Sequence, residues 1–348
     1  MPLLPRLLPK LQRHPKRIVF PEGADHRILQ AARQWVTGRL GVPVLLGNRT
    51  EIKQLAQQLH VNLEGIRILD PSRSDETESF AAHLHELREA KGMTLEEARE
   101  AVRDHTTFAA LMVMNNHVEA VVAGATQSAS NSLRPILQII PKLEGVRTVS
   151  SLMILDFDEK QIGSSGTLFM ADCGVLPNPS AEQLADIAVS TGIIAQHLTN
   201  ETPRIALLSY ASHGSSEEPS VLKMREATRL AQTRVSGSDL DFAIDGELQL
   251  DAAIDRHIAS AKRVDSPVAG RANVLVFPDL NSGNIGFKLV QHIAGANAFG
   301  QILTGLTKPA AEISRGSSAH DVFGAAVVCG VQAIDRAELF PALENFPE

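Results

Sequence analysis

The sequence is poor in aromatic residues and in cysteine. Only 4% of its 348 residues are aromatic, with a single Trp35 and a single Tyr210. So few rings give no evident platform on which nucleic-acid bases would stack. Cys173 and Cys329 are far apart and form neither a disulfide framework nor a zinc-binding spacing. A reducing cytoplasm is therefore the expected setting.

Excess basic charge and long apolar runs are also missing. The chain has 33 basic and 40 acidic residues, which gives a formal net charge of -7, and this balance disfavours nucleic acid as a partner. No stretch approaches the roughly 20 apolar residues that a membrane span requires. Because 44% of the residues are apolar, the chain can bury a large core. We expect a globular cytoplasmic protein of two or three domains.

Several standard catalytic motifs are absent. The chain has no G-x-x-x-x-G-K-[ST], no G-x-G-x-x-G after a strand, no H-E-x-x-H and no G-x-S-x-G. This disfavours P-loop kinases, Rossmann-type dehydrogenases, zinc proteases and lipase-like hydrolases. His83 and His85 are two residues apart and do not share a helical face. We predict no protein-bound metal.

What is present is an alternation of short β-branched runs with longer amphipathic segments. This pattern is typical of βαβ units, with helices covering both faces of a mainly parallel sheet. Thr94-x-x-Glu97 and Ser180-x-x-Gln183 have the spacing of helix capping boxes. The main predicted strands are 17–20, 42–46, 118–123, 205–209, 242–246, 274–277 and 299–303.

The pattern changes beyond Gly145. Residues 148–156 and 168–172 are predicted to be adjacent strands joined through Gly163-Ser164-Ser165-Gly166. We place a domain boundary in this region.

Polar loops follow several of these strands, where α/β proteins usually place their sites. They contain Ser128, Ser212 and Gly214, and the run Asn281-Ser282-Gly283-Asn284 before a helix expected to begin near Ile285. Asn and Ser are favoured helix caps, whereas exposed N–H groups at a helix start attract phosphate. Both interpretations stay open.

The richest polar stretch runs from Glu312 to Asp321. It contains Ser314, Arg315 and Asp321, which are residue types able to bind a phosphate and to move a proton. Ser318-x-x-Asp321 also has the spacing of a capping box, so a purely structural role for Asp321 stays open. Arg88 and Arg134 are ordinary surface residue types, and Cys173 is more typical of a small buried apolar residue than of a nucleophile.

Several separated segments resemble the signature segments of the phosphate acetyltransferases, also called phosphotransacetylases. The likeness runs from about Arg17 to Ala333, with the segments in the right order. The segments are Pro21-Glu22-Gly23 with Arg27, Leu133-Arg134-Pro135, 172–179, Asp245-Gly246-Glu247-Leu248-Gln249, 266–272, 279–284 and Ser314-Arg315-Gly316.

The resemblance implies two α/β domains with a cleft between them, similar to isocitrate and isopropylmalate dehydrogenases, in a homodimer. Domain one would comprise residues 1–148 and 302–348, and domain two the inserted residues 149–301. The reaction would be reversible acetyl transfer between CoA and phosphate, with CoA as a substrate and no tightly bound cofactor. The region 148–171 is slightly longer than in compact family members, which would affect the cleft rim or dimer contacts.

The resemblance also implies residue roles. Asp321 matches the proposed base that takes the proton from the CoA thiol, Ser314 the serine that hydrogen-bonds the reacting centre, and Arg315 its phosphoryl- or acyl-binding neighbour. The expected substrate-binding residues are Arg88, Arg134, Cys173, Ser128, Ser212, Gly214, Asn281, Ser282, Gly283 and Asn284.

Three alternatives remain at this stage. A phosphate butyryltransferase performs the same chemistry on a longer acyl chain. A non-catalytic acetyl-CoA-binding domain, like that of some malic enzymes, is disfavoured by the intact set of Ser314, Arg315 and Asp321. A metal-dependent dehydrogenase of the same fold lacks an evident pair of metal-binding carboxylates.

Overall fold

The computed structural model describes residues 2–157, 162–334 and 336–339. The chain divides into two compact units. Unit 1 comprises Met1–Arg6, Lys142–Gly305 and Asp335–Glu348, and unit 2 comprises Leu7–Pro141 and Leu306–Ile334. Four residues of the 148–171 region, 158–161, lie outside the described residues.

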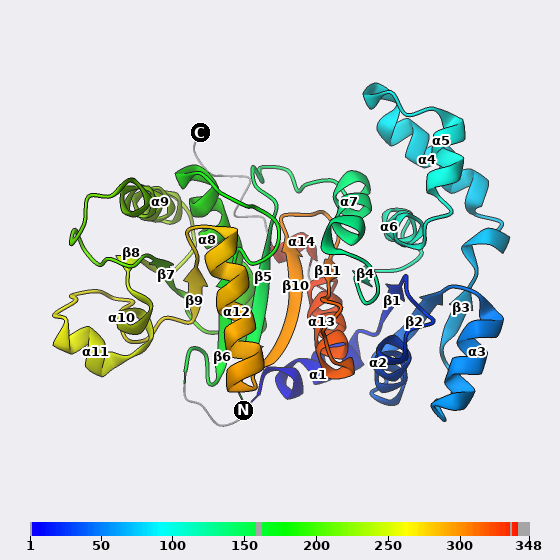
Figure 1. The fold of residues 1–348 in the computed structure, drawn as a ribbon, viewed down its shortest axis with the longest axis horizontal. Coiled ribbons are helices and arrows are strands. Elements are labelled where there is room, and N and C mark those ends of the chain that lie inside the picture. Colours follow the sequence, from blue (N-terminus) through cyan, green and yellow to red (C-terminus); the bar gives the residue numbers. More distant parts are fainter. Residues whose placement is uncertain (1, 158–161, 335, 340–348) are drawn as a thin grey trace. The chain divides into compact units, whose positions relative to one another are not determined.

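Unit 2 contains a parallel sheet. Its strand order is β3-β2-β1-β4-β11, and the neighbouring pairs are parallel (Figure 1). The strands are β1 (Lys16–Phe20), β2 (Gly41–Leu46), β3 (Arg67–Leu69), β4 (Ala120–Ala123) and β11 (Ala310–Glu312). The helices are α2 (His26–Thr37), α3 (Arg49–Gln58), η1 (Pro71–Arg73), α4 (Thr77–Arg88), η2 (Glu89–Lys91), α5 (Leu95–Ala101), α6 (His105–Met114), α7 (Ala129–Ile139) and α13 (Ala319–Gln332).

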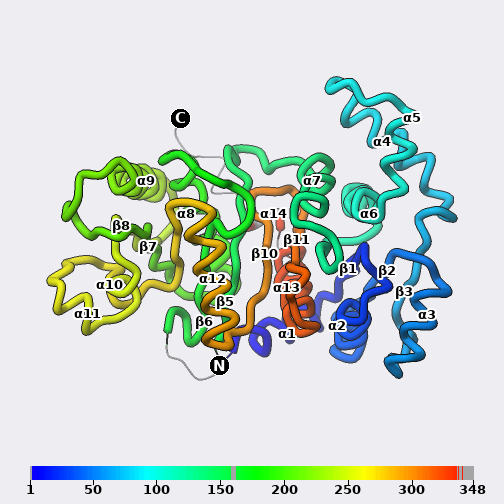
Figure 2. The backbone as a smooth tube through the Cα atoms, viewed as in Figure 1, coloured from blue at the N-terminus to red at the C-terminus, as the bar shows by residue number. Residues whose placement is uncertain are grey.

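The core of unit 2 joins segments from opposite ends of the sequence. Helix α13 contacts α2, and the tube in Figure 2 shows the red and blue segments side by side. Trp35 of α2 meets Phe323 of α13 edge to face, with ring centroids 6.5 Å apart. A Cβ on Gly330 would lie 3.0 Å from the Trp35 ring, so the absence of a side chain there permits this close packing.

Unit 1 contains a mixed sheet. Its strand order is β10-β5-β6-β9-β7-β8. The pairs β10–β5 and β5–β6 are antiparallel, whereas β6–β9, β9–β7 and β7–β8 are parallel. The strands are β5 (Ser150–Asp156), β6 (Thr167–Ala171), β7 (Arg204–Leu208), β8 (Ala243–Leu248), β9 (Val274–Val276) and β10 (Asn297–Thr304). The helices are α8 (Ala181–Thr199), α9 (Pro219–Ser236), α10 (Leu250–Ile254), α11 (Arg256–Ala261), α12 (Leu280–Ala294) and α14 (Arg336–Leu339), while α1 (Leu3–Arg13) begins the chain.

These elements confirm the α/β class and much of the local analysis. The predicted neighbours at 148–156 and 168–172 form the pair β5–β6. The capping boxes at Thr94 and Ser180 are both present, with reciprocal hydrogen bonds to Glu97 and Gln183.

The expected start of α12 near Ile285 is wrong by five residues, about one and a half turns. Asp279 caps this helix by accepting a hydrogen bond from the Ser282 amide at 2.9 Å, and the helix begins at Leu280. Asn281 to Asn284 therefore lie inside α12, within its first five residues. No helix in the described part of the chain is both long and apolar enough to cross a membrane.

Candidate active site

In unit 2, several of the predicted residues follow strands at the same edge of the sheet. Ser128 follows β4, whereas Ser314, Arg315 and Asp321 follow β11. Strands β4 and β11 are parallel neighbours, so their carboxyl ends bring these loops together. The loop after β1, which contains Asp25, ends at the same edge because β1 pairs parallel with β4.

The loop that carries Ser314 and Arg315 is held by Arg27, in the first turn of α2. The guanidinium Nη1 donates to the carbonyls of Arg315 (2.6 Å) and Ser317 (3.2 Å). Its Nη2 donates to the carbonyl of Ala125 in the loop after β4 and to Asp25 Oδ2. Its Nε donates to Asp25 Oδ1 at 3.0 Å. These contacts use all five N–H groups of the guanidinium, so a single side chain joins the loops after β4 and β11.

The Asp25–Arg27 pair is largely shielded from solvent. The two side chains are only 8% and 14% exposed. Burial alone would raise the pKa of Asp25, but the hydrogen bonds and charge of Arg27 outweigh burial and hold this pKa below its ordinary value. The Asp25 hydrogen bond in turn raises the pKa of Arg27. The pair stays ionised and keeps Arg27 aimed at the loop.

Ser314 and Arg315 are both exposed. The Ser314 Oγ accepts a hydrogen bond from the Gly316 amide at 3.2 Å. The Arg315 carbonyl is bound by Arg27, but its guanidinium makes no hydrogen bond or ion pair with the residues that the structure describes. Arg315 therefore presents an unpaired cation on a backbone that is fixed in place.

Asp321 forms the capping box that its spacing predicts. Its Oδ2 accepts a hydrogen bond from the Ser318 amide at 2.8 Å, and the Ser318 Oγ accepts one from the Asp321 amide at 3.1 Å. The side chain is 6% exposed. Because α13 begins at Ala319, Ser314 lies in the preceding loop and does not share the helix with Asp321.

The other predicted residues of unit 2 are more dispersed. Ser128 caps α7, accepting a hydrogen bond from the Asn131 amide. Arg134 is exposed on the same helix and makes no ion pair with described residues. Arg88 ends α4, and its Nε is buried without a hydrogen-bond partner among those residues. Arg88 makes no hydrogen bond or ion pair with the described Ser314 loop.

Glu22 supports the same edge of unit 2. Its Oε1 accepts a hydrogen bond from the Gly124 amide at 2.9 Å, and the residue is 9% exposed. Burial raises the pKa of Glu22 above its ordinary value. It borders a pocket of about 210 Å³ that also contacts Asp25, His105 and Thr126. Glu22 and Arg27 belong to segments that carry the family resemblance, but only the fold shows which loops they hold.

In unit 1, Asp172 organises the loop that contains Cys173. Its Oδ1 accepts hydrogen bonds from the amides of Gly174 and Val175, and its Oδ2 accepts one from Leu176. The Cys173 carbonyl accepts hydrogen bonds from Asn284 Nδ2 and from Gln301, each at 3.0 Å. Cys173 is thus joined through its backbone to the first turn of α12.

The Cys173 thiol itself is fully buried. Its Sγ donates to the Met170 carbonyl. Burial, and then the nearby charge of Asp172, raises the pKa of this thiol well above its ordinary value. A buried thiol of this kind stays protonated and is a poor nucleophile.

The run from Asn281 to Asn284 packs against the Cys173 loop. A Cβ on Gly283 would lie 2.3 Å from the Asp172 carbonyl, so glycine allows the start of α12 to approach this loop. Asn281 is exposed, and the Ser282 hydroxyl donates to the Asp279 carbonyl at 2.9 Å.

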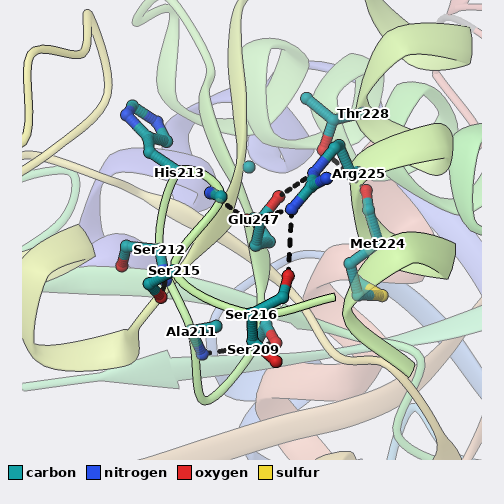
Figure 3. A network of polar contacts seen from close by, with 12 residues as sticks. Ser209, Ala211, Ser212, His213, Ser215, Ser216, Met224, Arg225, Thr228 and Glu247 are labelled. Atoms are coloured by element: carbon teal, nitrogen blue, oxygen red, sulfur yellow. Dashed lines mark hydrogen bonds and ion pairs between the residues drawn. The ribbon is translucent and has the colours of Figure 1, made fainter. Parts of the chain in front are cut away.

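Ser212 and Gly214 lie in the loop between β7 and α9, which a buried acid fixes (Figure 3). Glu247 of β8 is 1% exposed, and its Oε1 accepts a hydrogen bond from the Gly214 amide at 2.7 Å. Arg225 of α9 forms an ion pair with Glu247 and donates to the Ser216 carbonyl. The Ser212 Oγ accepts a hydrogen bond from the Gln249 amide at 2.9 Å. Hydrogen bonds at Ser212, Gly214 and Ser216 therefore hold this loop in place.

The predicted site residues thus fall into two sets, one in each unit. Unit 2 holds Ser128, Ser314, Arg315 and Asp321 at one sheet edge, with Arg134 on α7 and Arg88 further along the chain. Unit 1 holds Cys173 beside Gly283 and Asn284 of the Asn281–Asn284 run, and holds Ser212 and Gly214 in the loop after β7. Within the described residues, no group of three or more His, Cys, Asp or Glu side chains is placed to hold a metal ion.

A family model described as "Phosphate acetyl/butaryl transferase" matches residues 3–329. The chain belongs to this family. The match covers both units and the loops of both residue sets, which confirms the family resemblance found in the sequence.

Known relatives agree with this assignment. Phosphate acetyltransferase of Acetivibrio thermocellus is 41% identical over 333 residues, which is 96% of this chain and 98% of the relative. The crystal structure of a phosphotransacetylase from Streptococcus pyogenes superposes with a TM-score of 0.84 at 36% identity, covering 95% of this chain and 99% of that one.

A more distant likeness concerns the fold alone. The structure of a putative 4-hydroxythreonine-4-phosphate dehydrogenase from Salmonella typhimurium superposes with a TM-score of 0.51 at 13% identity, covering 93% of this chain and 98% of that one. This confirms the expected dehydrogenase-like fold class and says nothing about activity.

Proposed function

We propose that this chain is a phosphate acetyltransferase that reversibly transfers an acetyl group between CoA and phosphate. The observation that carries the proposal is its 41% identity to a phosphate acetyltransferase over nearly the whole of both chains. The fixed Ser314–Ser317 loop, with the exposed guanidinium of Arg315, suits a substrate that carries a phosphoryl group.

In the proposed reaction the CoA sulfur attacks the carbonyl carbon of acetyl phosphate directly. Asp321 takes the thiol proton, the S–C bond forms, and the C–O bond to phosphate then breaks to release phosphate. A thiol with a pKa of about 8.5 is mostly protonated at neutral pH, so a nearby carboxylate base accelerates this step. No enzyme nucleophile is required, which agrees with a buried and protonated Cys173.

The remaining residues bind and orient in this proposal. Arg315 neutralises the phosphoryl group, and Ser314 donates a hydrogen bond to the oxyanion that develops on the acetyl carbonyl. Arg88 and Arg134 bind anionic groups of the substrates. Ser128 in unit 2, and Ser212, Gly214 and Asn281–Asn284 in unit 1, bind the substrates, with the unit 1 loops contacting CoA. Holding both substrates in reacting geometry supplies much of the acceleration.

A turnover assay tests the function. Purified protein is mixed with CoA and either acetyl phosphate or butyryl phosphate, and thioester absorbance and thiol loss are followed. We expect turnover with acetyl phosphate and a much lower kcat/KM with butyryl phosphate. Preference for butyryl phosphate would identify a butyryltransferase, and CoA binding without turnover of either compound would support a non-catalytic acetyl-CoA-binding domain.

We also propose that the protein is a cytoplasmic homodimer, with domains at 1–148 plus 302–348 and at 149–301. The two cysteines are free thiols, which suits a reducing compartment. Helix α12 exposes an apolar stripe of Ile285, Leu289 and Ile293, which are 58%, 52% and 79% exposed. Their spacing of four residues places them on one helical face, and such a stripe is typical of a surface that a second subunit covers.

A further inference from the structure

Three arginines surround a pocket in unit 1 that the proposed reaction does not use. The pocket has a volume of about 590 Å³ and is lined by Ile162, Gly163, Arg204, Ile254, Arg256, Gly270 and Arg271. Among the residues that the structure describes, none of those lining the pocket is acidic. This volume is in the range of small-molecule sites.

The pocket lies at the edge of the sheet opposite to the predicted substrate loops of unit 1. Arg204 begins β7, Arg271 precedes β9 and Gly163 precedes β6. These three strands are parallel neighbours. Cys173, Ser212 and Asn281 follow the carboxyl ends of the same strands. A five-residue strand is roughly 15 Å long, so a ligand in this pocket would not compete directly for those loops.

The floor of the pocket is fixed. Arg204 donates to the carbonyls of Arg271, Thr202 and Gly163. Beneath it, Asn273 is 1% exposed and accepts a hydrogen bond from the Arg204 amide at 2.7 Å. A guanidinium has five N–H groups, so two of those on Arg204 remain available beyond these three contacts.

The other two arginines keep their terminal nitrogens unpaired. The Nε of Arg271 donates to the Pro267 carbonyl at 2.9 Å, which closes the loop 267–271. The terminal nitrogens of Arg271, and the whole guanidinium of Arg256, make no hydrogen bond or ion pair with the residues that the structure describes. A Cβ on Gly270 would lie 2.6 Å from the Cα of Arg256, so glycine lets the two arginine-bearing segments approach each other.

The described acidic residues balance the positive charge of this pocket only in part. Glu201 approaches Arg204 to no nearer than 4.0 Å. The carboxylate of Asp255, next to Arg256 in the chain, caps α11 by accepting hydrogen bonds from the amides of His257 and Ile258. Burial, together with the charges of Arg271 and Arg256, lowers the pKa of Arg204. An anion that binds between the three guanidinium groups would offset their mutual repulsion.

We propose that this pocket is a second anion-binding site that takes a small molecule carrying two or more phosphate groups. A multivalent oxyanion accepts hydrogen bonds from several guanidinium groups at once, and planar bidentate donors match phosphate geometry. The segment 266–272, which the proposed reaction leaves without a role, supplies Arg271 and Gly270. The pocket lies at the amino ends of strands whose carboxyl ends carry the substrate loops. A ligand bound here would therefore affect turnover only indirectly, through the structure of unit 1.

Titration calorimetry with inorganic pyrophosphate tests the proposal. The test variant is Arg256→Gln/Arg271→Gln, because both side chains are exposed and their loss leaves the Arg204 floor intact. The matched control is Arg103→Gln/Arg229→Gln, which removes the same charge from exposed positions outside the pocket, in the turn before α6 and on α9. Arg315→Ala reports any binding of pyrophosphate at the predicted catalytic loop. Melting temperatures without ligand verify that each variant is folded.

We expect the wild-type protein, the control and Arg315→Ala to share a pyrophosphate site whose affinity falls as salt increases. The test variant should bind at this site at least tenfold more weakly, while its basal turnover and its KM for CoA stay unchanged. Equal affinity in the test variant and the wild type would overturn the proposal. An equal loss in the control, or loss of the site in Arg315→Ala, would also overturn it. So would the absence of binding to the wild-type protein at roughly 10 mM pyrophosphate, tenfold above a Kd of 1 mM. These binding results are read without turnover, so they are independent of the proposed function.

Discussion

Arg27 holds the candidate catalytic loop without being predicted to touch a substrate. It joins the backbone of Arg315 and Ser317 to that of Ala125, and it does so from a buried ion pair with Asp25. A planar guanidinium can reach three carbonyls and a carboxylate at once, whereas a lysine ammonium cannot. The residue therefore acts as a positioning residue for Ser314 and Arg315.

We predict that Arg27→Lys folds but loses about 100-fold in kcat, because a shift of about 1 Å in a reacting group has that effect. The lysine keeps a positive charge beside Asp25, so the buried carboxylate is not left unpaired and the protein stays folded. Steady-state kinetics and thermal melting test this. Wild-type kcat in a folded Arg27→Lys protein would show that the loop does not depend on this side chain.

Asp321 has two possible roles that one substitution separates. In Asp321→Asn, the amide oxygen still accepts the hydrogen bond from the Ser318 amide, so the capping box survives. The base is lost, and we expect kcat to fall by on the order of 10²–10⁴, with a melting temperature close to that of the wild type. Matched kinetics and melting curves check this. A large fall in stability with little change in kcat would indicate that Asp321 serves only as a cap.

At the scale of elements, the loop between β7 and α9 depends on a buried acid. Burial alone would raise the pKa of Glu247, but hydrogen bonds from Arg225 and from the Gly214 amide, with the Arg225 charge, hold it below its ordinary value of 4.5. The folded state therefore releases this proton more readily than the unfolded state. The resulting stability is complete above the unfolded pKa and is lost as the pH falls through the folded one.

We predict that Glu247→Gln is less stable than the wild type at pH 7, and that this difference shrinks as the pH is lowered from about 5 towards 3, roughly the range below the unfolded pKa. Melting temperatures of both proteins across this range provide the measurement. The KM for CoA should rise in the variant, because Gly214 and Ser216 lose a fixed anchor. A stability difference that stays constant with pH would contradict the charged-pair account.

The sequence predicts the elements that have strong local signals. The capping boxes at Thr94, Ser180 and Ser318 follow from side-chain spacing within one helical turn, and all three form. The sequence pattern does not predict α1, because Pro5 and Pro9 interrupt it. It also misses β3 and β11, which have three residues each and are stabilised by neighbouring strands.

The candidate site is likewise predicted only in part. The resemblance names Ser314, Arg315 and Asp321, and the family match supports the activity. The long-range contacts of Arg27 with Arg315 and of Glu247 with Gly214 depend on strand pairing between segments far apart in the chain. Local patterns do not contain this information. The start of α12 is predicted too late because Asn281 and Ser282 are also favoured cap residues, whereas Asp279 is the residue that caps the helix.

At the scale of the whole molecule, the apolar stripe on α12 predicts self-association. Leu289 is 52% exposed in the middle of the stripe, so Leu289→Glu should leave the fold of one chain intact while placing a charge in the proposed subunit interface. Light scattering after gel filtration should show a dimer for the wild type and at least a tenfold weaker dimer for the variant. A charge at exposed Leu222 of α9 is the matched control. A monomeric wild-type protein would contradict the proposal.

The return of the chain to unit 2 has a consequence for biosynthesis. Strand β11 and helix α13 are the last elements of this unit to be made, about 170 residues after Pro141 by the boundaries of the unit. Until they emerge from the ribosome, Trp35 lacks Phe323 as a partner and β4 lacks β11, one of its two neighbouring strands. Domains tend to fold as units during synthesis, but unit 2 must wait while the whole of Lys142–Gly305 is translated. The same late segment carries Ser314, Arg315 and Asp321, so a nascent chain gains the proposed catalytic groups only when this unit can close its core.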